Sequence, residues 1–293
     1  MSMIDRYLLR YFLAVIDCGS LSKAAKQLNV AQPSLSVGIG KLERILGAPL
    51  FQRTSRRVHI TDAGSRFAAH ARRIENEFNL AEASVANLKP ARSLRLGVIS
   101  TYPISQLAEI LRAAKRPPDP ERLQIITGNE RELLHRLGRG QIEAALTIVR
   151  PNADGFAKEE LYAERYALAL SEEHPLAARP SIAAEDLSDS PMIVRRHCEV
   201  LAEISRHFTE RGVRPFLAFR GTDDEQVLHL VRAGVGATVM PESYAMPGVT
   251  RPRLAGFNLR RQMGIVYAAH AAHLQHAAPP VIEAVRARYS GVR

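Results

Sequence analysis

Residues 19–47 read GSLSKAAKQLNVAQPSLSVGIGKLERILG, a pattern that predicts two helices joined by a tight turn. The apolar residues of the first helix recur at helical spacing and are Leu21, Ala24, Ala25 and Leu28. Ser20 and Asn29 suit its two ends, because serine caps N-termini and asparagine tolerates the left-handed backbone conformation. The next helix begins near Gln32–Pro33, since proline is tolerated in a first turn, and Gly47 ends it. The stretch therefore has the layout of a helix-turn-helix.

The flanking sequence extends this motif into a winged domain followed by a long helix. An earlier amphipathic helix ends at Gly19 and carries Leu8, Tyr11, Phe12, Val15 and Ile16. Residues 48–54 and 56–62 form two short extended runs, which predict a β-hairpin wing. A helix capped at Thr61 or Asp62 then runs to about residue 88. Its apolar stripe suits pairing with a partner helix and comprises Phe67, His70, Ile74, Phe78, Ala81 and Val85.

The composition is that of an ordinary globular protein with one basic end. The chain has 293 residues, enough for two or three compact units, and nearly half of them are apolar. No apolar run approaches the ~18 residues that a membrane span requires, and the N-terminal stretch lacks the features of a signal peptide. The net charge is +10, and residues 1–60 contain nine lysines and arginines against three acidic residues. We therefore expect a cytoplasmic protein that binds nucleic acid and does not contact a membrane.

The second helix of the motif has a face poor in long side chains, opposite its core stripe. At 100° per residue the core stripe comprises Leu35, Ile39, Leu42 and Leu46. The opposite face can enter the DNA major groove, and its candidate contacts are Gln32, Pro33, Ser34, Ser36, Val37, Gly40, Lys41 and Arg44. Val37 lies at the centre of this face, where it favours a thymine methyl group.

Two glycines interrupt this helix, although glycine costs roughly 1 kcal/mol relative to alanine in a helix interior. Gly40 lies on the groove face, where it would let the backbone approach DNA closely. Alternatively, both positions merely tolerate a short side chain. Gly38 lies beside the core, so we expect Gly38→Ala to stabilise the head mildly without changing site preference. Gly40→Arg is expected to change or abolish that preference.

The first sixty residues resemble the winged helix of the LysR-type transcriptional regulators. The matching segments, in order, are GSLSKAAKQL, QPSLS, KLERILGAPLF followed by Arg53, and TDAG. The resemblance implies that Arg53 reaches the minor groove or its phosphates. Arg56 and Arg57 are either phosphate contacts or part of a solvated turn. Ala31, Val37 and Gly38 depart from the family pattern, which leaves open which bases are read.

From residue 94 onward, short apolar strands alternate with helices, a pattern typical of an α/β fold with largely parallel sheets. The expected strands are 94–100, 123–128, 143–149, 166–171, 191–195, 215–220, 237–241 and 263–269. The expected helices between them include 128–142, 199–212 and 223–234. This order of segments resembles the family's effector-binding domain, two α/β lobes with a ligand cleft between them. Matching landmarks are HPLA, AGVGATVMP and MGIVYAAH.

Polar residues follow several of these strands, where α/β folds bind ligands. The candidate effector residues are Ser100, Thr101, Gly128, Asn129, Arg195, Arg196 and Thr222. Adjacent arginines at a strand end can clamp a carboxylate, although only one of two neighbours can face a cleft, and a solvated pair or a salt bridge is the alternative. The resemblance implies that Ser100 and Asn129 line the site. It also implies a small organic anion as the effector.

Neither cysteine nor histidine spacing indicates a catalytic or metal site. Cys198 lies near the position of a reactive cysteine in peroxide-sensing relatives, but no second cysteine follows it, and cysteine is often simply buried. The histidines 270, 273 and 276 could share a helix face, but no carboxylate accompanies them, so a surface loop is the better interpretation. We find no motif for nucleophilic or acid–base catalysis and expect no catalytic residues, metal or cofactor.

These observations predict a multidomain transcriptional regulator and not an enzyme. Its parts are an all-α winged helix-turn-helix head, a long linker helix and a two-lobed α/β effector-binding domain. The expected ranges are 1–60, 61–90 and 91–293, with lobe I at about 92–165 and 267–293 and lobe II at about 166–266. The expected partners are double-stranded promoter DNA, a small effector and further copies of the chain, as a homodimer and, by the resemblance, a homotetramer. The rival hypothesis is a ligand-binding protein or enzyme whose basic head serves oligomerisation.

Overall fold

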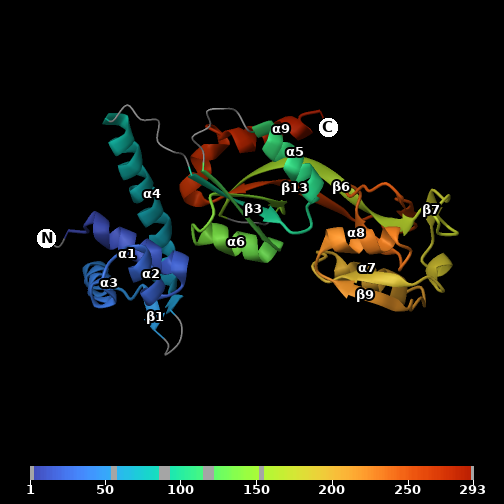
Figure 1. Cartoon of the computed structure of the whole chain (residues 1–293), viewed down its shortest axis with the longest axis horizontal. Helices are drawn as coiled ribbons and strands as arrows, with labels where there is room; N and C mark the ends of the chain where they lie inside the picture. Colours follow the sequence, from blue (N-terminus) through green and yellow to red (C-terminus); the bar gives the residue numbers. More distant parts are fainter. Residues whose placement is uncertain (1–2, 54–57, 86–92, 115–121, 152–154, 292–293) are drawn as a thin grey trace.

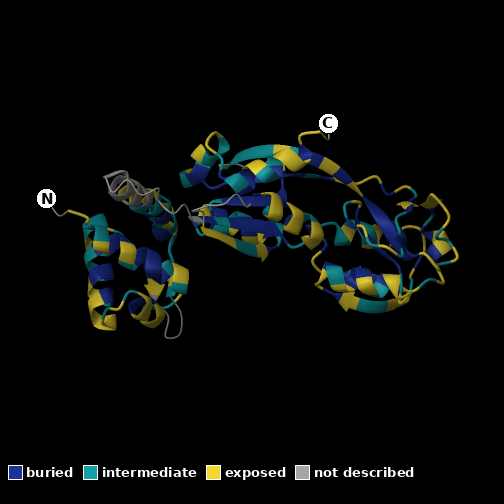
Figure 2. Ribbon diagram, turned by 45° about the horizontal axis from the view of Figure 1, so that its top comes forward, coloured by how far each residue is buried: buried dark blue, intermediate teal, exposed yellow. Residues whose placement is uncertain are grey.

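The computed structural model describes residues 3–53, 58–85, 93–114, 122–151 and 155–291. Along its long axis lie a small helical head, one long helix, and two α/β lobes (Figure 1). The strands at the centre of each lobe are buried, whereas helix faces and loops are exposed (Figure 2). Within the described ranges, no helix is both long enough and apolar enough to cross a bilayer. The predicted fold class is confirmed.

The head is a helix-turn-helix with a wing. Its elements are α1 (Arg6–Cys18), α2 (Leu21–Gln27), α3 (Gln32–Leu46), β1 (Phe51–Arg53) and β2 (Val58–Ile60). The predicted cap is present, because the Ser20 hydroxyl accepts a hydrogen bond from the Lys23 amide at 3.5 Å. Asn29 has a φ of 53°, the left-handed conformation expected of it. The sequence-based fold class described the head as all-α. The antiparallel β1–β2 hairpin shows that the head is not entirely helical.

Helix α4 (Asp62–Val85) follows the wing and is anchored against the head. The Thr61 hydroxyl accepts from the Gly64 amide at 3.0 Å and so caps the helix. A Cβ at Gly64 would lie 2.3 Å from the carbonyl oxygen of Leu50, so only glycine allows this approach to the wing. Further along, the Arg6 guanidinium pairs with Glu75 at 3.0 Å. The long helix is therefore fixed to the head from its first turn to just past its middle.

Lobe I is built on the parallel strands β4 (Arg122–Gly128), β3 (Ser93–Ile99) and β5 (Ala144–Ile148), in that spatial order. Its helices are α5 (Ile104–Ala114), α6 (Glu130–Gly138) and α9 (Pro280–Tyr289), with the short 3₁₀ helix η2 (Ala269–Gln275). The core is formed by buried aliphatic side chains of these elements, including Leu96, Leu133, Leu146 and Ile282. Helices α5 and α9 were not among the helices expected from the sequence.

Two long strands carry the chain between the lobes. Strand β6 (Ala157–Ser171) pairs with β13 (Arg260–Tyr267) over its first half and with β10 (Thr238–Pro241) over its second half. All these pairings are antiparallel, as is that of β13 with β5. The sheet is therefore mixed rather than largely parallel. The first half of β6 was not expected, because Lys158, Glu159 and Glu160 are consecutive charged residues and give it neither a buried-strand run nor a period-2 alternation.

Lobe II packs its helices against β6, β10 and a small parallel sheet. The remaining elements are β7 (Ser181–Ile182), η1 (Glu185–Leu187), β8 (Met192–Arg195), α7 (Leu201–Thr209), β9 (Leu217–Gly221), α8 (Asp224–Arg232), β11 (Val249–Thr250) and β12 (Arg253–Leu254). Strands β8 and β9 pair in parallel, and so do β7 and β12. Two clusters of buried side chains form the core of this lobe, one around Leu168 and one around Val227.

A buried guanidinium connects both lobes. Arg261, on β13, is 3% exposed and donates to the side-chain and main-chain oxygens of Thr101, each at 2.9 Å. It also donates to Glu164 of β6 at 2.9 Å and to Glu199 of lobe II at 2.7 Å. The Tyr166 hydroxyl completes the group by donating to Glu199 at 2.8 Å. Although burial opposes the charge, Glu164 and Glu199 raise the pKa of Arg261, so the guanidinium stays ionised.

A second ionic group lies between the head and lobe I. Asp17, near the end of α1, accepts from Arg72 of α4 at 2.6 Å and lies 4.0 Å from Arg95 of β3. Arg95 in turn pairs with Glu143, which precedes β5. Despite burial, the contacts of Glu143 with His270 and Arg95 lower its pKa to about 2. One carboxylate from the head thus separates two guanidinium groups, one from the linker helix and one from lobe I.

Replacing Arg261 tests whether the buried network holds the lobes. Arg261→Ala leaves the Glu164 and Glu199 carboxylates buried without their cation, so we expect the effector domain to lose about 3–5 kcal/mol of unfolding free energy. The adjacent Arg260 is exposed, and Arg260→Ala should change stability by about 0.5 kcal/mol or less. Urea unfolding followed by circular dichroism measures both. Equal midpoints for the two variants would contradict the assigned role of Arg261.

Candidate DNA-binding face and effector site

Helix α3 presents the predicted face to solvent. Gln32, Pro33, Ser34, Val37 and Arg44 are exposed, whereas the residues of the opposite stripe, Leu35, Ile39 and Leu42, are almost fully buried. Val37 is 73% exposed, which is high for an aliphatic side chain in the middle of a helix. Ser36, Gly40 and Lys41 are half-buried. The candidate contacts on α3 therefore lie together on one surface of the head.

Two polar side chains of this face are bound to other parts of the head. The Lys41 ammonium group donates to the Tyr7 hydroxyl and to Asp5, each at 3.2 Å. These hydrogen bonds, that to Tyr7 foremost, raise the pKa of Lys41. The Gln32 side-chain oxygen accepts from the Ser22 hydroxyl at 2.9 Å. Both side chains are thus partly directed along the head and away from the centre of the α3 face.

The wing places Arg53 at the end of β1, paired in register with Val58. The Arg53 side chain and the neighbouring Arg56 and Arg57 lie outside the described residues. Their assignment as minor-groove or phosphate contacts stays a prediction.

The two glycines of α3 differ sharply in their surroundings. A Cβ at Gly38 would lie 2.7 Å from the Tyr11 ring and 3.5 Å from Leu8, so α1 packs directly on the glycine. The expectation that Gly38 is a tolerated weakness is therefore wrong, because the sequence pattern did not reveal the close approach of Tyr11. At Gly40 nothing lies within 4 Å of the Cβ position. That position is open, as the groove-face assignment requires.

This difference gives a matched pair of variants. Gly38→Ala forces Tyr11 to move and should lower the free energy of unfolding of the head by about 1–3 kcal/mol, the cost of overpacking. Gly40→Ala meets no neighbour and should raise it by up to about 1 kcal/mol, through helix propensity. Thermal unfolding of both variants beside the unmodified protein measures the two shifts. Stabilisation by both substitutions would show that the packing of Tyr11 on Gly38 is not tight.

The candidate effector residues of lobe I gather at the ends of β3 and β4. The Ser100 amide donates to the Gly128 carbonyl at 2.9 Å, which joins the two strand ends. Thr101 follows Ser100 and is 1% exposed, and its hydroxyl oxygen accepts a hydrogen bond from Arg261. The Ser100 hydroxyl is buried and has no hydrogen-bond partner among the described residues. The structure thus brings all four lobe I candidates together, with one unused hydroxyl.

The N-terminus of α6 is already occupied by the helix's own acidic residues. Asn129 caps it by accepting from the Glu132 amide at 2.9 Å, and the Asn129 amide donates back to the Glu132 carboxylate at 3.1 Å. Glu130 adds a second carboxylate in the first turn and binds Arg150 at 2.6 Å. These charges complement the helix dipole, so a ligand anion would have to displace them.

In lobe II the two adjacent arginines point in different directions. Arg195 is 2% exposed and binds both carboxylate oxygens of Asp224 as well as the Val239 carbonyl oxygen at 3.1 Å. Although burial opposes its charge, Asp224 raises the pKa of Arg195. Arg196 and Thr222 are exposed. Arg195 therefore forms an internal salt bridge, the alternative left open by the sequence, and does not act as a free carboxylate clamp.

Three residues at the lobe junction were not singled out from the sequence. Arg261 and Glu199 form its central ion pair, and Arg150 follows β5 with its pKa raised chiefly by Glu130 and also by Tyr166 and Glu199. No local motif marks them, because their partners lie 20 to 160 residues away in sequence. Burial opposes ionisation of Glu199, yet the nearby Arg261 lowers its pKa. One Glu199 carboxylate oxygen remains buried without a partner among the described residues.

Cys198 lies beside this junction in an environment that disfavours the thiolate. Its side chain is buried, and burial raises the pKa of the thiol, with Glu199 adding to the effect. Arg195 opposes this shift through a contact of 3.6 Å to the sulfur. The other cysteine of the chain, Cys18, belongs to the head and donates to Gln27. The surroundings are those of a structural cysteine more than of a nucleophile.

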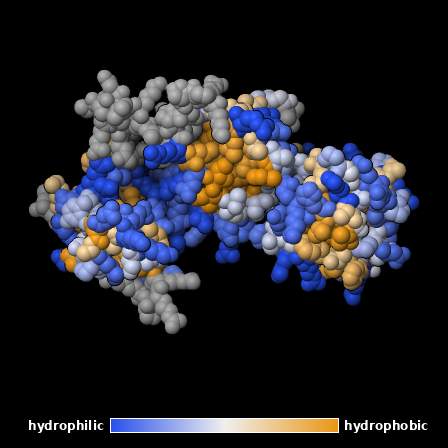
Figure 3. Space-filling model, in the orientation of Figure 1, coloured by the Kyte–Doolittle hydropathy of each residue, from blue (hydrophilic) through white to orange (hydrophobic). Residues whose placement is uncertain are grey.

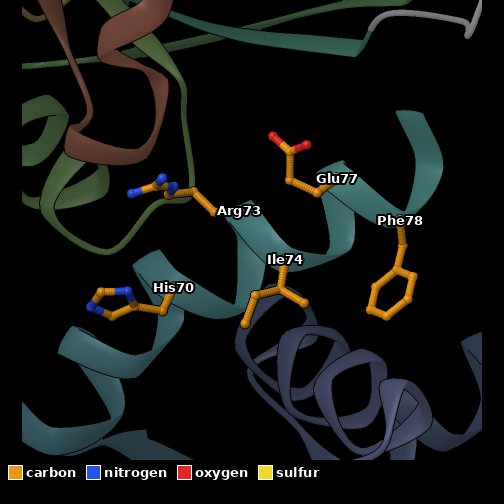
Figure 4. A pocket seen from close by; sticks show the side chains of 5 residues that line it. All are labelled: His70, Arg73, Ile74, Glu77 and Phe78. Atoms are coloured by element: carbon orange, nitrogen blue, oxygen red, sulfur yellow. The ribbon is translucent and has the colours of Figure 1, made fainter. Parts of the chain in front are cut away.

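Helix α4 carries part of its predicted apolar stripe on an open surface. A hollow of about 660 Å³ runs along it, lined by His70, Arg73, Ile74, Glu77 and Phe78 (Figure 4). Ile74 and Phe78 point to the same side of the helix and are 41% and 42% exposed. The Arg6 guanidinium lies 4.9 Å from the centre of the Phe78 ring. The side chains at positions 81 and 85 lie outside the described residues.

The two lobes also expose apolar surface. Figure 3 shows an apolar area on lobe I and a smaller one on lobe II. Exposed large apolar side chains in lobe I include Ile104 of α5 and Leu123 of the edge strand β4. In lobe II, Phe216 is 74% exposed beside β9. Exposed apolar areas of this kind mark interaction surfaces.

Comparison with known families accounts for both parts of the chain. Residues 7–65 match the model of the bacterial regulatory helix-turn-helix proteins of the lysR family, and residues 88–290 match that of the LysR substrate binding domain. The chain belongs to the LysR family. This membership confirms the resemblance on which the sequence-based prediction depended, and it makes the protein a DNA-binding transcriptional regulator.

Individual relatives of this LysR-family regulator include peroxide-responsive proteins. A hydrogen peroxide-inducible genes activator of Haemophilus influenzae is 30% identical over 83% of this chain and 82% of its own. The DNA-binding transcriptional dual regulator OxyR of Escherichia coli K12 is 28% identical over 97% and 95%. Among solved structures, a full-length OxyR variant from Pseudomonas aeruginosa has a TM-score of 0.73 at 22% identity, covering 98% and 96% of the two chains. CbnR in complex with its target DNA has a TM-score of 0.55 at 21% identity, covering 98% and 99%.

Proposed function

We propose that this regulator binds a partly palindromic promoter site through α3 and the wing, and that a small effector at the lobe junction controls it. The observation that supports this most is that one chain combines an exposed α3 face with two lobes joined by the buried Arg261 guanidinium. The protein would act by binding and not by catalysis. Because promoter DNA is its proposed target, we also propose that the protein acts in the cytoplasm.

Pairing of α4 helices would form the homodimer. Ile74 and Phe78 are exposed side by side on this helix, and a second copy's helix would cover them. Two heads would then face two half-sites, as dimeric helix-turn-helix proteins require. The apolar areas on the two lobes would provide further contacts for a homotetramer. CbnR, a structural neighbour of the same fold, was solved in complex with its target DNA, which supports DNA binding as the function of this fold.

The effector site would comprise Ser100, Thr101, Gly128 and Asn129 of lobe I and Arg196 and Thr222 of lobe II. A small organic anion is the effector class that we propose. Arg195 is committed to Asp224 and Arg150 is paired with Glu130, so the negative charge would be met by the exposed Arg196, or by Arg150 if the ligand displaces Glu130 from it. The unpartnered Ser100 hydroxyl supplies a neutral hydrogen bond. Binding would favour one arrangement of the lobes by its differential affinity for two states.

A thermal-shift screen of small organic acids, with their amides as neutral controls, tests the effector proposal. An acid that binds should raise the unfolding temperature and change the bending of bound DNA in a fluorescence assay. For the Ser100→Ala protein, both effects should need an acid concentration about tenfold higher, because one buried hydrogen bond to the ligand is lost. Ser105→Ala, on the exposed side of α5, should leave the required concentration unchanged. Equal responses to acids and amides, or an unaffected Ser100→Ala protein, would contradict an anion at this site.

A response to peroxide through Cys198 is the second candidate, favoured by the names of the relatives and by the Arg195 contact to the sulfur. Oxidation of one thiol to a sulfenic acid needs no second cysteine, but it needs the thiolate. Burial and Glu199 both raise the pKa of Cys198, which makes the thiolate scarce at neutral pH. We therefore place this candidate second.

Alkylation of Cys198 in a Cys18→Ser background separates the two candidates. The rate of reaction with iodoacetamide should be low at pH 7 and should increase with pH. The midpoint of this increase should lie at a higher pH than for an exposed thiol, because the thiolate forms only as pH passes the raised pKa. Glu199→Gln should move this midpoint to lower pH, whereas Glu210→Gln, an exposed change directly after α7, should not. Rapid alkylation at pH 7, together with a peroxide response of a reporter gene that Cys198→Ser abolishes, would favour peroxide sensing.

A further inference from the structure

The centre of the α3 face is apolar, although residues 1–60 carry nine lysines and arginines against three acidic residues. Val37 projects from the middle of this face and is 73% exposed, without serving the core of the head. One turn further along, Gly40 offers no side chain, and nothing lies within 4 Å of its Cβ position. One turn before Val37 stands Ser34, a short and exposed side chain. Val37 is therefore the most prominent group at the centre of the surface that meets DNA.

The long polar side chains that could compete with Val37 for the bases are held elsewhere. Lys41 follows Val37 by four residues, which places it on the same side of the helix. Its ammonium group is drawn towards α1 by Asp5 and Tyr7, each at 3.2 Å. Gln32, at the start of the helix, is bound to Ser22 of α2 at 2.9 Å. The head's own hydrogen bonds thus keep two candidate base-reading side chains away from the centre.

We propose that Val37 is a specificity-determining residue that packs on the C5-methyl group of a thymine in each half-site. The thymine methyl is the one apolar group that base pairs present in the major groove. A cytosine amino group or a purine acceptor opposite Val37 would lose its water without gaining a hydrogen bond, which is unfavourable. The open position at Gly40 lets the helix approach closely enough for van der Waals contact. This inference rests on the proposed DNA binding through α3 and names the base that the face selects.

Deoxyuridine, which is thymine without the methyl group, tests the contact directly. Operator DNA is first selected from a random-sequence pool with the full-length protein, and each thymine in a half-site is then replaced singly by deoxyuridine. One position per half-site should bind the unmodified protein about fourfold more weakly, the equilibrium equivalent of one buried methyl group. Val37→Ala should bind thymine and deoxyuridine at that position equally well.

Arg44→Ala is the matched control, because Arg44 is exposed on the same helix and suited to a phosphate contact. It should weaken binding to all DNAs alike and retain the fourfold deoxyuridine effect. If no single thymine is sensitive, or if Val37→Ala keeps the sensitivity, the proposal is overturned. Failure of the protein to select any operator would instead count against DNA binding through α3. Unchanged thermal unfolding of Val37→Ala, expected for an exposed residue, excludes misfolding as the cause.

Discussion

The arrangement of the effector domain depends on the buried guanidinium of Arg261. It binds the end of β3 in lobe I, the crossing strand β6 through Glu164, and lobe II through Glu199. A buried charge of this kind is tolerated only while its partners remain in place, because each carboxylate that loses it stays buried and unpaired. The relative position of the lobes is therefore coupled to this ion-pair network. A ligand that competes for Thr101 or Glu199 would act on the same network.

The head is coupled to this domain by the second ionic group. Asp17 of α1 lies between Arg72 of the linker helix and Arg95 of β3, the strand that Ser100 and Thr101 follow. Burial and the nearby Arg95 both lower the pKa of Arg72, so the two cations depend on the head's carboxylate. In the proposed mechanism, a change at the end of β3 would reach the helix-turn-helix along this strand and through Asp17. Two discrete arrangements of this contact would provide the states that an effector must distinguish.

Much of the fold could be predicted from the sequence because local signals agree there. Apolar spacing, the caps at Ser20 and Thr61 and the left-handed Asn29 define the head without tertiary information. Features formed by distant residues could not be predicted: the packing of Tyr11 on Gly38, the commitment of Arg195 to Asp224 and the Arg261 network. The same holds for the charged half of β6, whose strand conformation depends on pairing with β13 about a hundred residues later. The predicted strand ends place Ser100 and Asn129 close together, as the structure also does, but burial decides which polar groups there are free.

The central claim is that the α3 face recognises a specific DNA sequence, and a comparison of affinities tests it most directly. Binding of the full-length protein to an operator selected from a random pool is compared, at one fixed salt concentration, with binding to a scrambled duplex of equal length and composition. The account predicts an affinity at least ~10³-fold higher for the operator, as specific regulators show over non-specific DNA. Equal affinities for the two duplexes would contradict it and would leave the basic head as an oligomerisation or non-specific module.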